Sequence, residues 1–114
     1  MTSERMKATK ILEELIGYFF NHNIDYLQME LEYKDTEFII KVEGTCSSRP
    51  SDLDHLNELL NTPRQAELEE YYWGLLGGNS QRQELNLLGS LVDCADVIFN
   101  EEILSVTVYR KTQS

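Results

Sequence analysis

The chain has 114 residues, of which 41% are hydrophobic and 10% aromatic, so it can build one packed core and is not a disordered polypeptide. Twenty acidic residues against ten basic ones give a formal net charge of −10, which argues against nucleic acid and anionic membrane surfaces as partners. We therefore expect a single domain over residues 1–114 whose partner is a protein, with a basic protein favoured by the charge.

The cysteines and the ends of the chain bear on its compartment. Cys46 and Cys94 have neither the spacing of a zinc site nor the number needed for a disulfide scaffold. The first ten residues, MTSERMKATK, are polar and do not form a signal peptide, and no apolar run approaches the ~20 residues of a membrane span. We expect a cytoplasmic protein with reduced thiols, no metal and no cofactor.

The first half of the chain changes its hydrophobic period once. An amphipathic helix is predicted from Ser3 to Phe20, because apolar side chains recur there at intervals of three and four residues. Over 27–33 and 38–42, apolar and polar side chains alternate, which predicts two strands that each bury one face. The short polar turn over 34–36 indicates that these strands form an antiparallel hairpin.

The second half of the chain is predicted to contain three helices and another hairpin. Ser51, Thr62 and Ser80 are the expected helix caps, and the third helix is expected to fade near Asp96. Short strands are predicted over 97–99 and 103–110. The element order α-β-β-α-α-α-β-β predicts an α+β fold, a two-layer sandwich in which helices cover one face of a mostly antiparallel sheet of about four strands.

Few polar groups are arranged in a way that could support catalysis. Asp52 and His55 share a helical face, but one such pair makes neither a metal site nor an acid–base system, and a solvated helix start is the simpler interpretation. His22 is interpreted as part of a helix end. Cys46 lies in a serine-rich loop without an activating base. We predict no catalytic residue, and we do not expect an enzyme.

Aromatic and apolar side chains are better candidates for binding a partner. Tyr71, Tyr72 and Trp73 are consecutive, so they cannot all face one side of a helix, and Trp73 is expected to point partly outward. There it would serve either as a partner anchor or as a lid over the core edge, and we keep both alternatives. Ile39 interrupts the polar side of its strand. Together with an exposed last strand, it leaves a homodimer as one alternative.

Three segments carry a resemblance to a known family. Glu14-Leu15-Ile16 is similar to the opening of that family's N-box, and the segment 39–44 (IIKVEG) resembles its strand that ends in Asp-x-Gly. The segment 84–93 (ELNLLGSLVD), followed by 106–110 (VTVYR), is similar to its Gly-rich helix start and C-terminal strands. With the element order, these segments resemble the Bergerat-fold ATPase domains (GHKL) of histidine kinases, gyrase and anti-sigma factor kinases, over most of the chain.

The chain departs from this family at the nucleotide positions. The family's magnesium-binding Asn corresponds to Tyr18, and its adenine-binding Asp corresponds to Val42, whereas the following Gly is kept as Gly44. Its phosphate-loop glycines fall near Arg82 and Glu84, where a carboxylate would repel a triphosphate. The resemblance therefore implies a degenerate member, a pseudo-kinase that has lost its ATP and magnesium sites.

Three functional hypotheses follow. The first is a non-catalytic regulatory domain that binds a protein, which by family analogy is a sigma factor, an anti-sigma-type regulator or a kinase module. The alternative is an acidic, chaperone-like protein that holds a basic or apolar segment of a client. The third is an atypical nucleotide-binding kinase whose site uses unorthodox residues.

Overall fold

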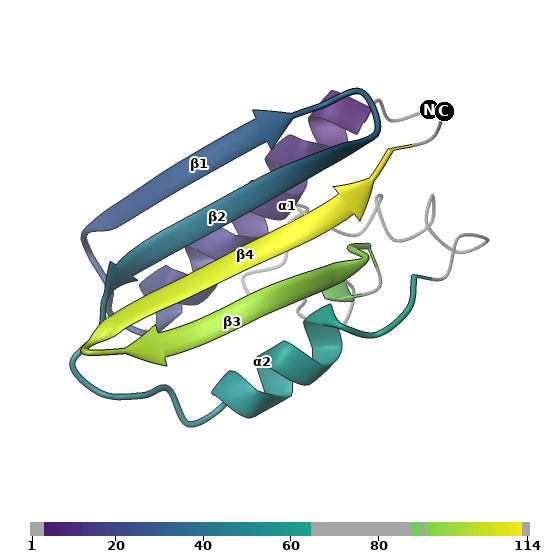
Figure 1. Ribbon diagram of the computed structural model, residues 1–114. Helices are drawn as coiled ribbons and strands as arrows, with labels where there is room; N and C mark the ends of the chain where they lie inside the picture. Colours follow the sequence, from purple (N-terminus) through teal and green to yellow (C-terminus); the bar gives the residue numbers. More distant parts are fainter. Residues whose placement is uncertain (1–3, 65–87, 90, 113–114) are drawn as a thin grey trace.

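The computed structural model describes residues 4–64, 88–89 and 91–112. The predicted α+β sandwich is confirmed: a four-stranded antiparallel sheet of order β1-β2-β4-β3 has helices on one face (Figure 1). The described elements are α1 (Glu4–Asn21), β1 (Leu27–Tyr33), β2 (Glu37–Thr45), α2 (Leu53–Leu60), β3 (Cys94–Asn100) and β4 (Ile103–Lys111). Most of the helix predicted from Thr62 and the first part of the helix predicted from Ser80 lie outside the described residues, and with them Tyr71, Tyr72, Trp73, Arg82 and Glu84. The described residues 62–64 are not helical, so the predicted start at Pro63 was wrong.

The core lies between the two central strands and the helices. Alternate side chains of β2 and β4 point to the helical side and are fully buried, and Ile40 pairs with Val108 while Val42 pairs with Val106. α1 packs mainly against β2, and α2 packs mainly against β3. The helices supply the opposing apolar side chains, which are Ala8, Ile11, Leu15, Tyr18, Phe19, Leu53, Leu56 and Leu60.

β1 does not have the buried face that its alternation predicts. Its apolar residues lie on the helical side of the sheet, because Met29 pairs with Val42 and Leu31 pairs with Ile40. Nevertheless, Met29 is 45% exposed and Leu31 is 49% exposed. The prediction was wrong because α1 lies over the neighbouring strand β2, so the outermost strand extends beyond the helix that covers the sheet.

The second hairpin also differs from the prediction. β3 begins at Cys94, so the preceding helix does not extend to Asp96 and the strand is longer than 97–99. The alternation of β3 was obscured because Ile98, an apolar residue, points to the outer face and is 55% exposed. β4 lies between β2 and β3, so the expectation that the last strand is an exposed edge was wrong; the edges are β1 and β3.

The start of α2 needed correction as well. The N-cap of α2 is Asp52, not Ser51, and the Asp52 side chain makes no capping hydrogen bond. Gly89 lies against α2. A Cβ at Gly89 would stand only 2.3 Å from the carbonyl oxygen of Leu59, so a larger residue would force the two segments apart.

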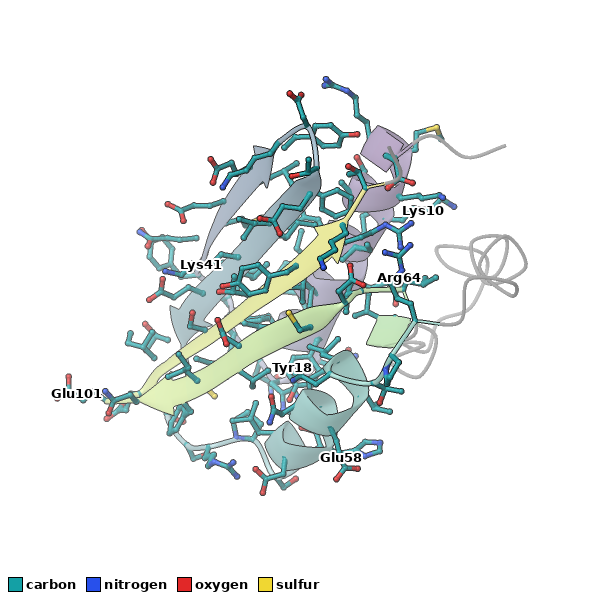
Figure 2. All side chains as sticks on the ribbon, turned by 45° about the vertical axis from the view of Figure 1, so that its right-hand side comes forward. Lys10, Tyr18, Lys41, Glu58, Arg64 and Glu101 are labelled. Atoms are coloured by element: carbon teal, nitrogen blue, oxygen red, sulfur yellow. The ribbon has the colours of Figure 1, made fainter. Side chains whose placement is uncertain are left out.

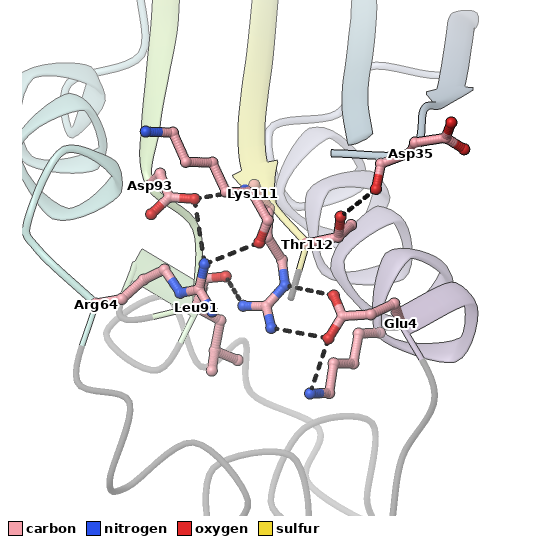
Figure 3. Close-up of polar contacts among 9 residues, drawn as sticks. Glu4, Asp35, Arg64, Leu91, Asp93, Lys111 and Thr112 are labelled. Carbon is pink, nitrogen blue, oxygen red and sulfur yellow. Dashed lines mark hydrogen bonds and ion pairs between the residues drawn. The ribbon is translucent and has the colours of Figure 1, made fainter. Parts of the chain in front are cut away.

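A buried arginine ties both ends of the chain together (Figure 3). Arg110 continues the inward row of β4 and is only 1% exposed. Its Nε donates to Glu4 in the first turn of α1 at 3.2 Å, and its Nη1 donates to the carbonyl oxygen of Leu91 at 2.7 Å. The charge-assisted bonds hold α1, β4 and the segment before β3 in one arrangement.

Candidate functional site

The residue at the expected magnesium position, Tyr18, is engaged within the protein. Its hydroxyl donates to the Asp52 Oδ1 at 2.7 Å, and the Nε2 of His22 lies 3.3 Å from the same oxygen. The rings of Tyr18 and His22 are in contact, with their centroids 4.5 Å apart. Figure 2 shows Tyr18 beside α2, and these contacts therefore connect the end of α1 to the start of α2.

The environment of Tyr18 keeps its hydroxyl protonated. Burial, followed by the hydrogen bond to Asp52 and the charge of that carboxylate, raises the pKa of Tyr18 far above its ordinary value. A phenol in this state is a hydrogen-bond donor and not a base or an anionic metal ligand. The Tyr18 hydroxyl thus connects α1 to the residue at which α2 begins.

A polar cavity of about 460 Å³ lies next to this contact. It is lined by His22, Asn23, Ile24 and the loop residues 45–51. The buried Cys46 thiol donates to the carbonyl oxygen of Ser48 at 3.0 Å, and the Arg49 guanidinium pairs with Asp54. The Cys46 thiol is thus hydrogen-bonded to a backbone carbonyl oxygen, and the contacts found in the described part of the chain do not pair it with a basic side chain, which covalent catalysis uses.

Two of the other residues at the expected nucleotide positions are buried within β2. Val42 is fully buried in the core, and Gly44 is buried where β2 passes the segment before β1. Glu14 is half-buried on α1, and His55 is exposed on α2 without sharing the contacts of Asp52. Within residues 4–64, 88–89 and 91–112, no group of three or more His, Cys, Asp or Glu side chains is placed to hold a metal ion.

A second candidate site is an apolar surface along the edge of the sheet. Met29, Leu31 and Tyr33, which we call the β1 row, share the helical side of β1 and are 39–49% exposed. The guanidinium carbon of Arg5 lies 4.7 Å from the centre of the Tyr33 ring, so this side of α1 faces β1.

Two half-buried residues of α1 extend this surface. Leu12 and Ile16 lie seven and eleven residues after Arg5, which corresponds to about two and three helical turns, so they lie on the same side of the helix. The β1 row together with Leu12 and Ile16 forms what we call the α1–β1 strip. Single exposed apolar residues are ordinary on protein surfaces, whereas several exposed apolar residues on one side of an edge strand are typical of a binding site.

The opposite face of β1 is acidic. Glu30 and Glu32 are exposed there, and a shallow depression of about 330 Å³ joins them to Ile39 and Lys41 of β2. Ile39, the apolar residue expected to contact a partner, is half-buried on this face opposite Glu32. The edge of the sheet is therefore apolar toward the helices, and on its outer side it carries two carboxylates, of which Glu30 stands directly opposite Lys41 of β2.

Neither candidate site was apparent from local sequence spacing. Tyr18 and Asp52 are 34 residues apart, and no periodic pattern connects them. The alternation of β1 predicted which of its residues share the apolar face, but not that this face is exposed, which depends on where α1 lies.

No helix in the described part of the chain is long and apolar enough to cross a membrane. Comparison of the chain with protein-family models, curated proteins and solved structures gives no significant match.

Proposed function

We propose that this protein is a non-catalytic binding domain whose partner is a basic protein that docks on the α1–β1 strip. The observation that carries the proposal is the exposure of the β1 row on the side of the sheet where the core lies. Contact with a partner would remove this apolar surface from water, which stabilises the complex by roughly 25 cal/mol for each Å² that is buried. The net charge of −10, with Glu30 and Glu32 beside the strip, favours a partner of positive charge.

The contacts of Tyr18 and Val42, which stand at the nucleotide positions of the resembled family, support a non-catalytic role. The Tyr18 hydroxyl donates to Asp52, and Val42 is enclosed by the core, so neither side chain is free to bind a nucleotide. We place the protein on a Bergerat-type scaffold that has lost its ATP chemistry, and a sigma factor or anti-sigma-type regulator is the partner class that this scaffold implies. A chaperone-like role would use the same strip with many clients.

A pair of matched variants tests the docking surface. Leu31→Ser removes an exposed apolar side chain from the strip, whereas Ile98→Ser removes one of similar exposure from the outer face of β3. Proteins retained from the native host by immobilised wild-type protein are compared quantitatively with those retained by each variant. We expect one defined basic protein to be kept by Ile98→Ser and lost by Leu31→Ser. Equal retention by both variants would refute the proposal, and loss of many unrelated proteins would favour the chaperone-like role.

A second measurement separates the binding role from an atypical kinase. A ligand that binds only the folded state raises the melting temperature of a protein. We expect ATP with magnesium to leave the melting temperature of the wild-type protein unchanged. A rise that depends on ATP concentration would overturn the non-catalytic assignment.

A further inference from the structure

We infer that the partner binds as an additional strand on the free edge of β1, and that the bound segment alternates apolar and basic residues. This inference rests on the proposed function and specifies the partner at the same surface. It follows from three features of β1, namely the direction of its backbone groups, the side chains on its two faces and the charge at its edge.

Among the residues that the structure describes, the backbone of β1 offers unpaired groups at the same positions as the β1 row. The Lys34 N–H donates to the Glu37 carbonyl oxygen at 2.8 Å, which makes this pair a hydrogen-bonded pair of the hairpin. Hydrogen-bonded and non-hydrogen-bonded pairs alternate along an antiparallel ladder, and the register is continuous back to Leu27. Residues 28, 30 and 32 therefore bond to β2, while residues 29, 31 and 33 direct their N–H and C=O groups to the edge.

The two faces of β1 define the side chains of a matching strand. A strand added to β1 continues both layers of the sandwich, and its side chains alternate between the two faces. Residues on the helical side would pack beside Met29 and Leu31 and cover the strip that α1 leaves open. Residues on the outer side would stand beside Glu30 and Glu32, where opposite charge stabilises a cross-strand pair. The segment that fits both faces alternates valine- or leucine-like residues with lysine or arginine.

Two symmetric pairings of β1 with a second copy of this chain bring like charges together. In a symmetric antiparallel pairing centred on Leu31, Glu30 of one copy would stand directly opposite Glu32 of the other. A pairing centred on Glu30 would place Glu30 opposite itself. Like charges directly opposite each other destabilise a strand pair, so the charge at this edge disfavours these two self-pairings, whereas a basic strand meets opposite charge.

The other edge of the sheet lacks these properties. The residues on the helical side of β3 are Ala95, Val97 and Phe99, which are buried or half-buried because α2 packs against this strand. Its outer side carries one carboxylate, Asp96, next to the exposed Ile98. The strand-addition site is therefore assigned to β1.

The test uses labelled synthetic peptides as long as β1 and the full-length protein. One peptide alternates lysine and valine, a second has the same composition with the lysines grouped at one end, and a third replaces lysine by glutamate. Fluorescence anisotropy measures affinity. Hydrogen exchange measured by NMR reports which amides become protected. We expect the alternating lysine peptide to bind at least tenfold more tightly than the other two, and to protect the amides of Met29, Leu31 and Tyr33.

Charge reversal gives a matched control. Glu30→Lys/Glu32→Lys is expected to weaken binding of the alternating lysine peptide roughly tenfold, because two cross-strand charge pairs are lost, and to allow the glutamate peptide to bind. Glu101→Lys/Glu102→Lys changes the net charge equally at the distant β3–β4 turn, and it should have less than a twofold effect at physiological salt.

The outcomes distinguish this inference from the proposed function. If no peptide binds, or if the amides of 29, 31 and 33 gain no protection, strand addition is refuted. Loss of the native partner by Leu31→Ser would then still support docking on the α1–β1 strip. If Leu31→Ser keeps the partner, both proposals fail. A wild-type dimer that Leu31→Ser abolishes in sedimentation measurements would assign the edge to a second copy and overturn the inference.

Discussion

The buried pair of Arg110 and Glu4 gives the most quantitative prediction about stability. Arg110 is 1% exposed, and its Nε and Nη2 both donate to the Glu4 carboxylate, at 3.2 and 3.5 Å. Glu4 also pairs with Lys7 at 3.2 Å, and its side chain is 19% exposed. Removing one partner of a buried ion pair typically costs 3–5 kcal/mol, because the other charge stays buried without compensation.

Glu4→Gln keeps the shape of the side chain but removes its charge. Because water reaches Glu4, we expect a loss below that range, about 2–3 kcal/mol in the free energy of unfolding. Arg110→Met removes the buried charge itself and leaves the Leu91 carbonyl without this donor, which we expect to cost about 1–2 kcal/mol. The double variant has neither charge of the pair. Adding Glu4→Gln to Arg110→Met should therefore lower the free energy of unfolding by at most about 0.5 kcal/mol.

Urea unfolding followed by circular dichroism measures all three variants, with Glu13→Gln on the exposed side of α1 as the control. Glu13→Gln should change the free energy of unfolding by less than about 0.5 kcal/mol. The expected coupling between Glu4 and Arg110 is about 2 kcal/mol, obtained from the double-mutant cycle. If the two single losses simply add, the pair is not coupled and the reasoning from burial is wrong.

The same pair predicts a pH dependence. Burial alone would raise the pKa of Glu4, but Arg110 and Lys7 together outweigh burial and hold this pKa below its usual value of 4.5. A carboxyl group with a lowered folded-state pKa binds fewer protons in the folded protein than in the unfolded chain, so its contribution is present above pH 4.5 and is lost as the pH falls through the folded-state pKa. The difference in the free energy of unfolding between the wild type and Glu4→Gln should therefore become smaller as the pH falls below 4.5.

Three further changes test individual contacts by urea unfolding. Tyr18→Phe should cost about 1 kcal/mol, because Asp52 loses its donor. Since the folded-state pKa of Tyr18 is raised above its ordinary value of 10.0, this contribution should be complete below pH 10 and fall progressively as the pH rises above it. An equal difference in the free energy of unfolding at all pH values would contradict the assigned contact. Gly44→Ala should cost about 1–3 kcal/mol, because a Cβ would lie 2.6 Å from the Ile24 Cγ2, and a neutral result would show that β2 can shift. Glu102→Gly should stabilise the protein by about 0.5–1 kcal/mol, because its φ of 65° disfavours a side chain, whereas Glu102→Ala should not.

The strands that carry the core were predictable because their signal is local. Alternation gave β2 and β4 within a few residues, since residues such as Ile40 and Val106 need only the period of a strand to reach the buried side. The start of β3 was not predictable in this way. Helix-like spacing of leucines runs up to Val92, and the outward-pointing Ile98 breaks the alternation that follows.

The contacts that define the candidate sites depend on packing between distant segments. Tyr18 meets Asp52 only because α1 ends where α2 begins, and a sequence period contains no such information. The inward position of Arg110 could be read from its place in the row of Leu104, Val106 and Val108, but its acceptor on α1 could not. The exposure of Leu31 likewise depends on α1 lying over β2.

Glu30 and Glu32 on the edge strand β1 affect both self-association and the choice of partner. A strand at the edge of a sheet with an apolar row is a ready template for unwanted pairing, and natural proteins protect such edges with charged side chains. Glu30 and Glu32 give this protection against a symmetric pairing centred on Leu31, because Glu30 of each copy would face Glu32 of the other. They do so without covering the backbone groups at 29, 31 and 33, so the edge stays open to a strand that brings positive charge. A neutral residue at position 30 or 32 would weaken both the repulsion of a second copy and the attraction of a basic strand. The same two glutamates therefore oppose self-association and determine the chemistry of the partner.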